Sequence, residues 1–264
     1  MIQSHKLVQS ALAAHWDNMA EEFCQFEIPD KSKDALTRLL DEEGILKDCA
    51  TALDIGCGAG RYSIALAQDI AVVHGFDISP KMVAYARENA LKHQVDNVWF
   101  DASNWDVDTL DQKEFKPQYD LVFAHMTPAI HTKEDFRKMM STAAKWGVLT
   151  MHVRRHDSIL DDLEKTLYGK QRLNQRDDQL LTYFAMLWQE GYNPKLHYES
   201  LTWENTRSYD KACTYYLGRL KTAYAVTQAE EKTVKTYLKQ MAAKGRLTET
   251  ITSTAVTLYW KKKE

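Results

Sequence analysis

The residues whose types and spacing point most clearly to chemistry lie in LDIGCGAGRYS, residues 53–63. An apolar run ends near Asp54, glycines follow at positions 56, 58 and 60, and a helical pattern then begins. Glycines in this arrangement allow a tight turn and a close approach of a ligand to the backbone. Open α/β sheets bind ligands at such turns, at the carboxyl ends of their strands. A structural strand–helix turn is the alternative, and Asp77 at the end of the next strand argues against it.

The glycine spacing argues against two familiar nucleotide loops. The dinucleotide fingerprint GxGxxG requires a third glycine one position later, where this chain has Arg61. A phosphate-binding loop would end in Gly-Lys-Ser/Thr, and no such ending is present. A nicotinamide-dependent dehydrogenase is therefore disfavoured.

Two histidines are candidates for a general base. His125, near the end of the fourth predicted strand, lies where a substrate would enter and is the first candidate, and His152, which ends the fifth strand, is the second. Each has a second interpretation as a packing or hydrogen-bonding residue. The segment HVRRHD (152–157) spaces two histidines four residues apart, but it leaves a strand and lacks the glutamate of HExxH. We therefore expect no metal site.

Alternating strand and helix patterns must position these residues. Strands are predicted over 51–56, 71–77, 98–103, 119–126 and 147–153. Helices are predicted between them over 60–68, 81–93 and 133–145. This alternation predicts a parallel, doubly wound α/β sheet with right-handed crossovers.

The flanking segments are mostly helical. Residues 1–46 are expected to form an N-terminal helical cap, and 47–264 the main domain with a helical insertion at about 157–194. Segments 195–206 and 248–260 have strand patterns. A capping box, TQAE, opens a further helix at residue 227.

These motifs resemble class I S-adenosylmethionine (SAM) dependent methyltransferases. The resemblance rests on LDIGCGAG, GFDISPKMVAYAREN, FDAS and YDLVFAHM, in the family's order, and covers roughly residues 48–153. It extends loosely to the last two strands. It implies a doubly wound, Rossmann-like α/β sheet of seven strands, mostly parallel with an antiparallel last strand.

The resemblance also implies a role for each motif residue. The glycines would admit the methionine part of SAM, while Asp54 would orient the loop or meet the ammonium group. Asp77 would accept the ribose hydroxyls, and Ile78 and Met82 would pack on the adenine. The full expected cofactor-binding set is Trp16, Asp54, Gly56, Cys57, Gly58, Gly60, Asp77, Ile78, Met82, Asp101, Ala102, His125 and Met126.

The remaining members of this set lie after the third and fourth strands and in the N-terminal segment. Asp101 resembles the carboxylate that accepts the adenine amino group, and Ala102 would supply a backbone amide. His125 and Met126 would flank the sulfonium. Trp16 would either close over the sulfonium, where an aromatic face attracts a cation, or pack in the core of an amphipathic helix.

Composition limits the partners. The 264 residues carry a net charge of −3, which argues against a dedicated nucleic-acid binder. No apolar run approaches the length of a membrane span, and the cysteines lie far apart without a CxxC pair. We therefore expect a cytoplasmic protein with no membrane partner. Its oligomeric state is left open.

These observations predict an enzyme that uses SAM to methylate a small-molecule acceptor (EC 2.1.1.-). The stretch HMTPAI after the fourth strand lacks the Asn/Asp-Pro-Pro-aromatic motif of amino-methylating nucleobase enzymes. Two alternatives stay open: a SAM-binding regulatory protein without turnover, and a methyltransferase acting on RNA or protein.

Overall fold

The computed structural model describes residues 2–103, 105, 119–169 and 175–263. Side chains are described from residue 12 in the first helix and from residue 177 in the eighth.

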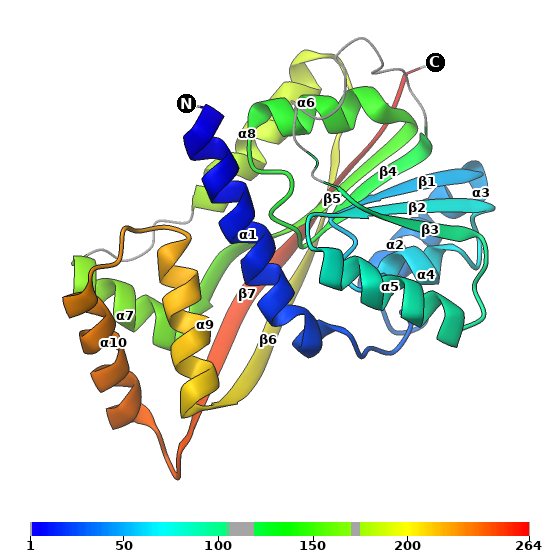
Figure 1. The fold of residues 1–264 in the computed structure, drawn as a ribbon. Coiled ribbons are helices and arrows are strands. Elements are labelled where there is room, and N and C mark those ends of the chain that lie inside the picture. The colour runs from blue at the N-terminus through cyan, green and yellow to red at the C-terminus, as the bar shows by residue number, and fades with distance from the viewer. Residues whose placement is uncertain (1, 104, 106–118, 170–174, 264) are drawn as a thin grey trace. The chain divides into compact units, whose positions relative to one another are not determined.

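A seven-stranded sheet in the order β3-β2-β1-β4-β5-β7-β6 organises the fold (Figure 1). Its strands are β1 Thr51–Ile55, β2 Val72–Asp77, β3 Val98–Ala102, β4 Tyr119–His125, β5 Ala143–Asp157, β6 Lys195–Ser208 and β7 Arg246–Lys261. The pairs β1–β2, β1–β4, β2–β3 and β4–β5 are parallel, and β7 is antiparallel. The predicted Rossmann-like sheet with an antiparallel last strand is confirmed.

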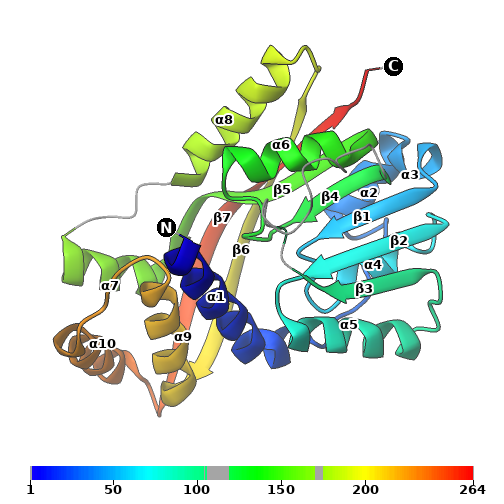
Figure 2. The same cartoon turned by 45° about the horizontal axis from the view of Figure 1, so that its top comes forward.

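The described residues form helices between and around these strands (Figure 2). They are α1 Ile2–Phe23, α2 Ala35–Glu42, α3 Ile45–Asp48, α4 Arg61–Leu66, α5 Pro80–Lys92, α6 Lys133–Thr142, α7 Ser158–Tyr168, α8 Gln175–Gln189, α9 Tyr209–Lys221 and α10 Gln228–Met241. Local signals explain several of the starts. Ser79 caps α5 ahead of Pro80, and Thr132 and Thr227 open α6 and α10 with capping boxes.

One large apolar cluster packs α2, α3 and α4 onto the sheet. Leucines of α2 and the apolar residues of α3 and α4 pack against alternate residues of the strands, such as Ala52, Val73 and Phe123. A second cluster joins α5 to β3 through Val83, Ala86 and Phe100. Both clusters thus pack the helices that precede and follow β1 and β2 onto the sheet.

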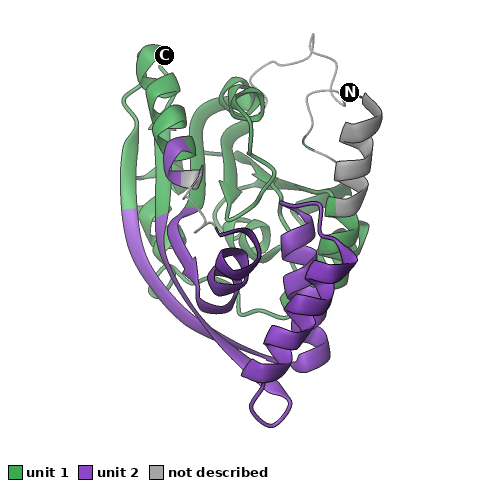
Figure 3. Cartoon of the chain, turned by 90° about the vertical axis from the view of Figure 1, so that its left-hand side faces the viewer, with its two compact units in different colours: residues 1–151, 179–197, 256–264 green, residues 152–178, 198–255 purple. Residues whose placement is uncertain are grey.

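The chain divides into two compact units, coloured separately in Figure 3. Unit 1 comprises residues 1–151, 179–197 and 256–264, and unit 2 comprises 152–178 and 198–255. The N-terminal helices therefore belong to the same unit as the glycine-rich turn. The segment 157–194, expected from the sequence as one insertion, is divided between the two units.

Some element boundaries differ from the sequence prediction. The helix expected over 133–145 ends at Thr142, and β5 begins at Ala143. Tertiary pairing decides this boundary, because Ala143 pairs with Tyr119 of β4 and the Trp146 indole donates to Asp48. The helix α9 had no distinctive sequence pattern and was not predicted.

Close packing of Gly147 on Trp260 yields a stability prediction. A Cβ atom at Gly147 would overlap the Trp260 indole, which is itself fully buried. We expect Gly147→Ala to lower the free energy of unfolding by about 1–3 kcal/mol, as overpacking does in rigid cores. Urea denaturation would measure it. In a Trp260→Leu background the same substitution should cost much less, and an equal cost in both backgrounds would contradict the overlap.

Candidate functional site

The turn after β1 is fastened to the end of β2. The backbone N–H groups of Gly56 and Cys57 both donate to the Phe76 carbonyl, at 2.7 and 2.9 Å. The Gly60 N–H donates to the Cys57 carbonyl at 3.0 Å, and α4 begins at the next residue. We call residues 56–60 the glycine loop. Main-chain hydrogen bonds therefore hold both ends of this loop.

The three glycines of the loop share a backbone conformation but differ in their surroundings. All three have positive φ, which L side chains adopt only with strain. A Cβ on Gly56 would overlap Thr127, and one on Gly60 would lie 2.9 Å from the Phe100 ring. A Cβ on Gly58 would meet nothing within 4 Å. The loop therefore packs closely on the protein at its two ends and leaves open space at its centre.

Asp77 joins this loop to the next helix. One carboxylate oxygen accepts the Gly58 N–H and the other accepts the Ser79 N–H, each at 2.9 Å. Burial raises the pKa of Asp77, and these two hydrogen bonds act in the opposite direction. Asp77 is the last residue of β2, in agreement with the strand predicted over residues 71–77.

The N-terminal helix adds a residue that sequence reasoning missed. Asp17 of α1 accepts hydrogen bonds from the Ser79 hydroxyl and from the Lys81 backbone N–H, the latter at 3.2 Å. A carboxylate at this position satisfies exposed donors at the start of α5. The Ser79-Pro80 cap was visible in the sequence, but nothing in the sequence indicated a second carboxylate from 62 residues away.

The same helix packs on the glycine loop. Ala20 of α1, Ala59 of the loop and Met82 of α5 form a buried cluster, with the half-buried Trp16 against it. Helix α1 also contacts α5, and the two helices are labelled in Figure 2. The structure thus brings together Trp16, Met82 and the loop, three of the elements that the sequence proposed as neighbours.

Asp54 lies beneath the loop and is 2% exposed. The Ser63 hydroxyl, on α4, donates to it at 2.6 Å. Burial, aided by the charge of Asp77 and opposed by the Ser63 hydrogen bonds, raises the pKa of Asp54 to about 7. Of the two roles left open by the sequence, this contact is the geometry expected for orienting the loop and helix.

The other members of the expected set lie around this end of the sheet. The Cys57 side chain is buried against α5, and this burial raises the pKa of its thiol. Because the side chain is buried, only the Cys57 backbone is left to contact a ligand. Ile78 follows Asp77 and is half-buried, and Ala102 pairs with Asp77 in the sheet register. Met126 has a positive φ of 52°, and its N–H donates to the Thr150 carbonyl.

His125 packs against an aromatic ring from α4. The ring centroids of His125 and Tyr62 are 4.1 Å apart, and the Tyr62 hydroxyl donates to Asp34 at 2.9 Å. Asp34 in turn caps α2. The position of the His125 ring is therefore set by α4 and α2 as well as by its own strand.

His152 belongs to unit 2 and has its own partners there. Its Nδ1 lies 2.9 Å from the Ser253 hydroxyl, and its ring lies 5.6 Å from that of Trp203. The Arg155 guanidinium contacts the same indole and also pairs with Asp157. No group of three potential metal ligands occurs among the residues that the structure describes.

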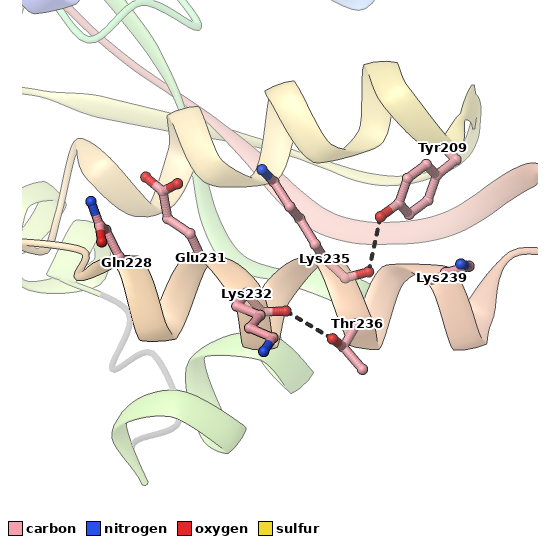
Figure 4. Close-up of a pocket in the computed structure, with 7 residues that line it drawn as sticks. All are labelled: Tyr209, Gln228, Glu231, Lys232, Lys235, Thr236 and Lys239. Atoms are coloured by element: carbon pink, nitrogen blue, oxygen red, sulfur yellow. Dashed lines mark hydrogen bonds between the residues drawn. The ribbon is translucent and has the colours of Figure 1, made fainter.

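Unit 2 also carries a groove between α9 and α10 (Figure 4). It has a volume of about 290 Å³ and is lined by Tyr209, Gln228, Glu231, Lys232, Lys235, Thr236 and Lys239. None of these residues belongs to the glycine loop or to the set expected from the sequence. In the described part of the chain, no helix is long and apolar enough to cross a membrane.

The buried Asp54 leads to a prediction about pH. A carboxyl group whose pKa is raised on folding stabilises the protein below its unfolded pKa, near 4, and this contribution is lost as the pH rises through about 7. Replacing the Asp54 carboxyl group should therefore change the free energy of unfolding most at high pH. We expect Asp54→Asn to gain stability relative to the wild type between pH 4 and pH 8, by up to about 4 kcal/mol.

Urea denaturation at several pH values would measure this difference. The exposed Asp178 provides the matched control, because its replacement by asparagine removes no buried charge. A difference between wild type and Asp54→Asn that stays constant from pH 4 to pH 8 would contradict the assignment.

Comparisons with solved structures agree with this fold. The structure of magnesium protoporphyrin IX methyltransferase (ChlM) from Synechocystis PCC 6803, with bound SAH, is similar with a TM-score of 0.54 at 16% identity. The similarity covers 97% of this chain and 100% of that one. The BH2331 protein of Bacillus halodurans C-125 is similar with a TM-score of 0.51 at 16% identity, over 86% of this chain and 98% of that one.

Sequence comparisons identify the family. A release factor glutamine methyltransferase of Fusobacterium nucleatum is 38% identical over 90 residues, which are 33% of this chain and 24% of that protein. The chain spans less than a quarter of the length of the curated relatives it matches. A family model described as a methyltransferase domain matches residues 46–204, more than half of the chain. The chain therefore belongs to the family of SAM-dependent methyltransferase domains.

Proposed function

We propose that this methyltransferase binds SAM on the glycine loop and transfers its methyl group to a small-molecule acceptor. The open space above Gly58 supports the location, because the loop is closely packed at both ends and unoccupied by protein atoms at its centre. Bound SAM supplies a methyl group on a sulfonium, so the chain's own residues need only bind, orient and exclude water.

Asp77 is suited to hold the ribose. An ionised carboxylate offers about four lone-pair sites, and the Gly58 and Ser79 amides use two of them. The remaining sites are available to the two ribose hydroxyls. Ile78 and Met82 then line the adenine site, and the backbone of Ala102 lies beside it. Gly56, Cys57 and Gly60 contribute backbone around the methionine part.

The packing of α1 on the glycine loop supports the proposal that the acceptor is a small molecule. Trp16 and Ala20 lie against Ala59 and Met82, so this helix covers part of the end of the sheet where the cofactor would bind. Enclosure excludes water, which would otherwise weaken electrostatic interactions with the sulfonium. The net charge of −3 also disfavours RNA, whose phosphates require a basic surface.

His125 is the proposed base when the acceptor must lose a proton. It is the last residue of β4, next to Met126, and its ring packs on Tyr62, whose own hydroxyl donates to Asp34. His152 of unit 2 is the second candidate, held by the Ser253 hydroxyl. Neither is needed for an acceptor that is already nucleophilic, since methyl transfer is then a matter of alignment.

Labelled SAM tests the acceptor class. The purified chain would be incubated with methyl-tritiated SAM in three separate reactions. These contain a small-molecule extract, total RNA or a protein extract. We expect label to enter the small-molecule fraction alone. The partial similarity to a release factor methyltransferase and to ribosomal RNA methyltransferases makes the other fractions informative. Transfer to RNA or protein, and none to small molecules, would contradict the proposal.

Gly58 tests the location of the cofactor. Gly58→Val would place a branched side chain in the open space and should abolish binding of SAM and SAH in calorimetry. Gly44→Val is a matched control, because Gly44 also has a positive φ and open space around its Cβ but lies outside the loop. Both variants carry the same kind of backbone strain. Equal SAM affinity in both would show that the cofactor binds elsewhere.

A further inference from the structure

A histidine on β2 links two side chains that belong to other strands. The Tyr119 hydroxyl, at the start of β4, lies 2.9 Å from His74 Nδ1. His74 Nε2 lies 2.7 Å from an Asp101 carboxylate oxygen at the end of β3. Asp101 is the residue that the sequence assigned to the adenine amino group, whereas no role had been assigned to His74 or Tyr119.

The chemistry of the three groups indicates the donor and the acceptor in each of the two hydrogen bonds. An ionised carboxylate can only accept, so the proton lies on His74 Nε2 and is donated to Asp101. In the tautomer with its proton on Nε2, Nδ1 is an acceptor and the Tyr119 hydroxyl donates to it. Burial and the charge of Asp101 raise the pKa of Tyr119, which keeps this hydroxyl protonated. The three groups therefore form a chain with one consistent direction.

The strands explain why the carboxylate turns toward His74. In the β2–β3 register Asp101 pairs with Phe76, and His74 lies two residues earlier on the same face. The Phe76 ring packs against the imidazole with centroids 4.3 Å apart, which restricts its rotation. Although the Asp101 side chain is 57% exposed, one of its oxygens is thus held by a side chain that is 23% exposed.

The other Asp101 carboxylate oxygen can still accept a hydrogen bond. Its nearest described cation is the Arg87 guanidinium at 3.9 Å, too far for a hydrogen bond. That guanidinium donates instead to the Phe100 carbonyl, with Nε at 3.1 Å. Arg87 therefore contributes charge but leaves this oxygen able to accept another donor.

We infer that His74 is a positioning residue: it holds Asp101 so that the free oxygen accepts the amino group of the cofactor's adenine. The inference rests on the proposed SAM site. An exposed carboxylate loses side-chain freedom when it binds a ligand, and a carboxylate already ordered by His74 and Tyr119 loses less. His74 acts through Asp101 and contacts no ligand itself.

Calorimetry with two ligands tests this role. The first is SAH, and the second is its analogue with purine in place of adenine, which lacks the amino group. We expect His74→Leu to lower SAH affinity about tenfold, the equivalent of one hydrogen bond, and to leave affinity for the analogue unchanged. His74→Gln retains an N–H donor and should recover most of the loss. Tyr119→Phe should lower SAH affinity less, and in the same selective way.

Two further variants separate the possible failures. Asp101→Ala should lower the affinity for SAH and not for the analogue; no effect would refute the adenine assignment itself. His156→Gln, at an exposed histidine of unit 2, should change neither affinity. If His74→Leu does not fold, Tyr119→Phe decides the question. Unchanged SAH affinity, a gain in SAH affinity, or an equal loss for both ligands would overturn the positioning role.

Discussion

The Asp77 carboxylate accepts the backbone N–H groups of Gly58 and Ser79, and the glycine-loop end of the fold depends on this pair of hydrogen bonds. Through them one side chain at the end of β2 fixes the centre of the glycine loop and the start of α5. Asp17 of α1 completes the arrangement by bonding to the Ser79 hydroxyl. Loop, strand and two helices are thereby held in one geometry before any ligand binds, which reduces the ordering cost of binding.

This arrangement concentrates negative charge in a small buried volume. Burial raises the pKa of both Asp54 and Asp77, and each is raised further by a neighbouring carboxylate, Asp77 and Asp17 respectively. Such a cluster is unfavourable by itself, because like charges repel and burial disfavours ionisation. A ligand with a sulfonium and an ammonium group would offset that repulsion. The electrostatics of the loop thus suit the cofactor of the family to which the chain belongs.

Much of the fold followed from local patterns. The alternation of apolar strands and amphipathic helices predicted the doubly wound sheet, and the antiparallel last strand agreed with the structure. The α6–β5 boundary was displaced, since Ala143 and Trp146 gain more from pairing with β4 and from the Asp48 hydrogen bond than from helix propensity. Pairing between strands depends on residues distant in sequence, and local propensity does not contain it.

Local sequence patterns were enough to predict the glycine loop and the carboxylate at the end of β2. Backbone geometry restricts which residues tolerate a positive φ, and strand ends place their carboxylates predictably. The partners of those residues follow instead from how distant elements pack. Asp17 reaches Ser79 from another helix, and His74 reaches Asp101 across a strand pair and Tyr119 beyond it. These contacts depend on how distant elements pack, and no spacing along the chain encodes that distance.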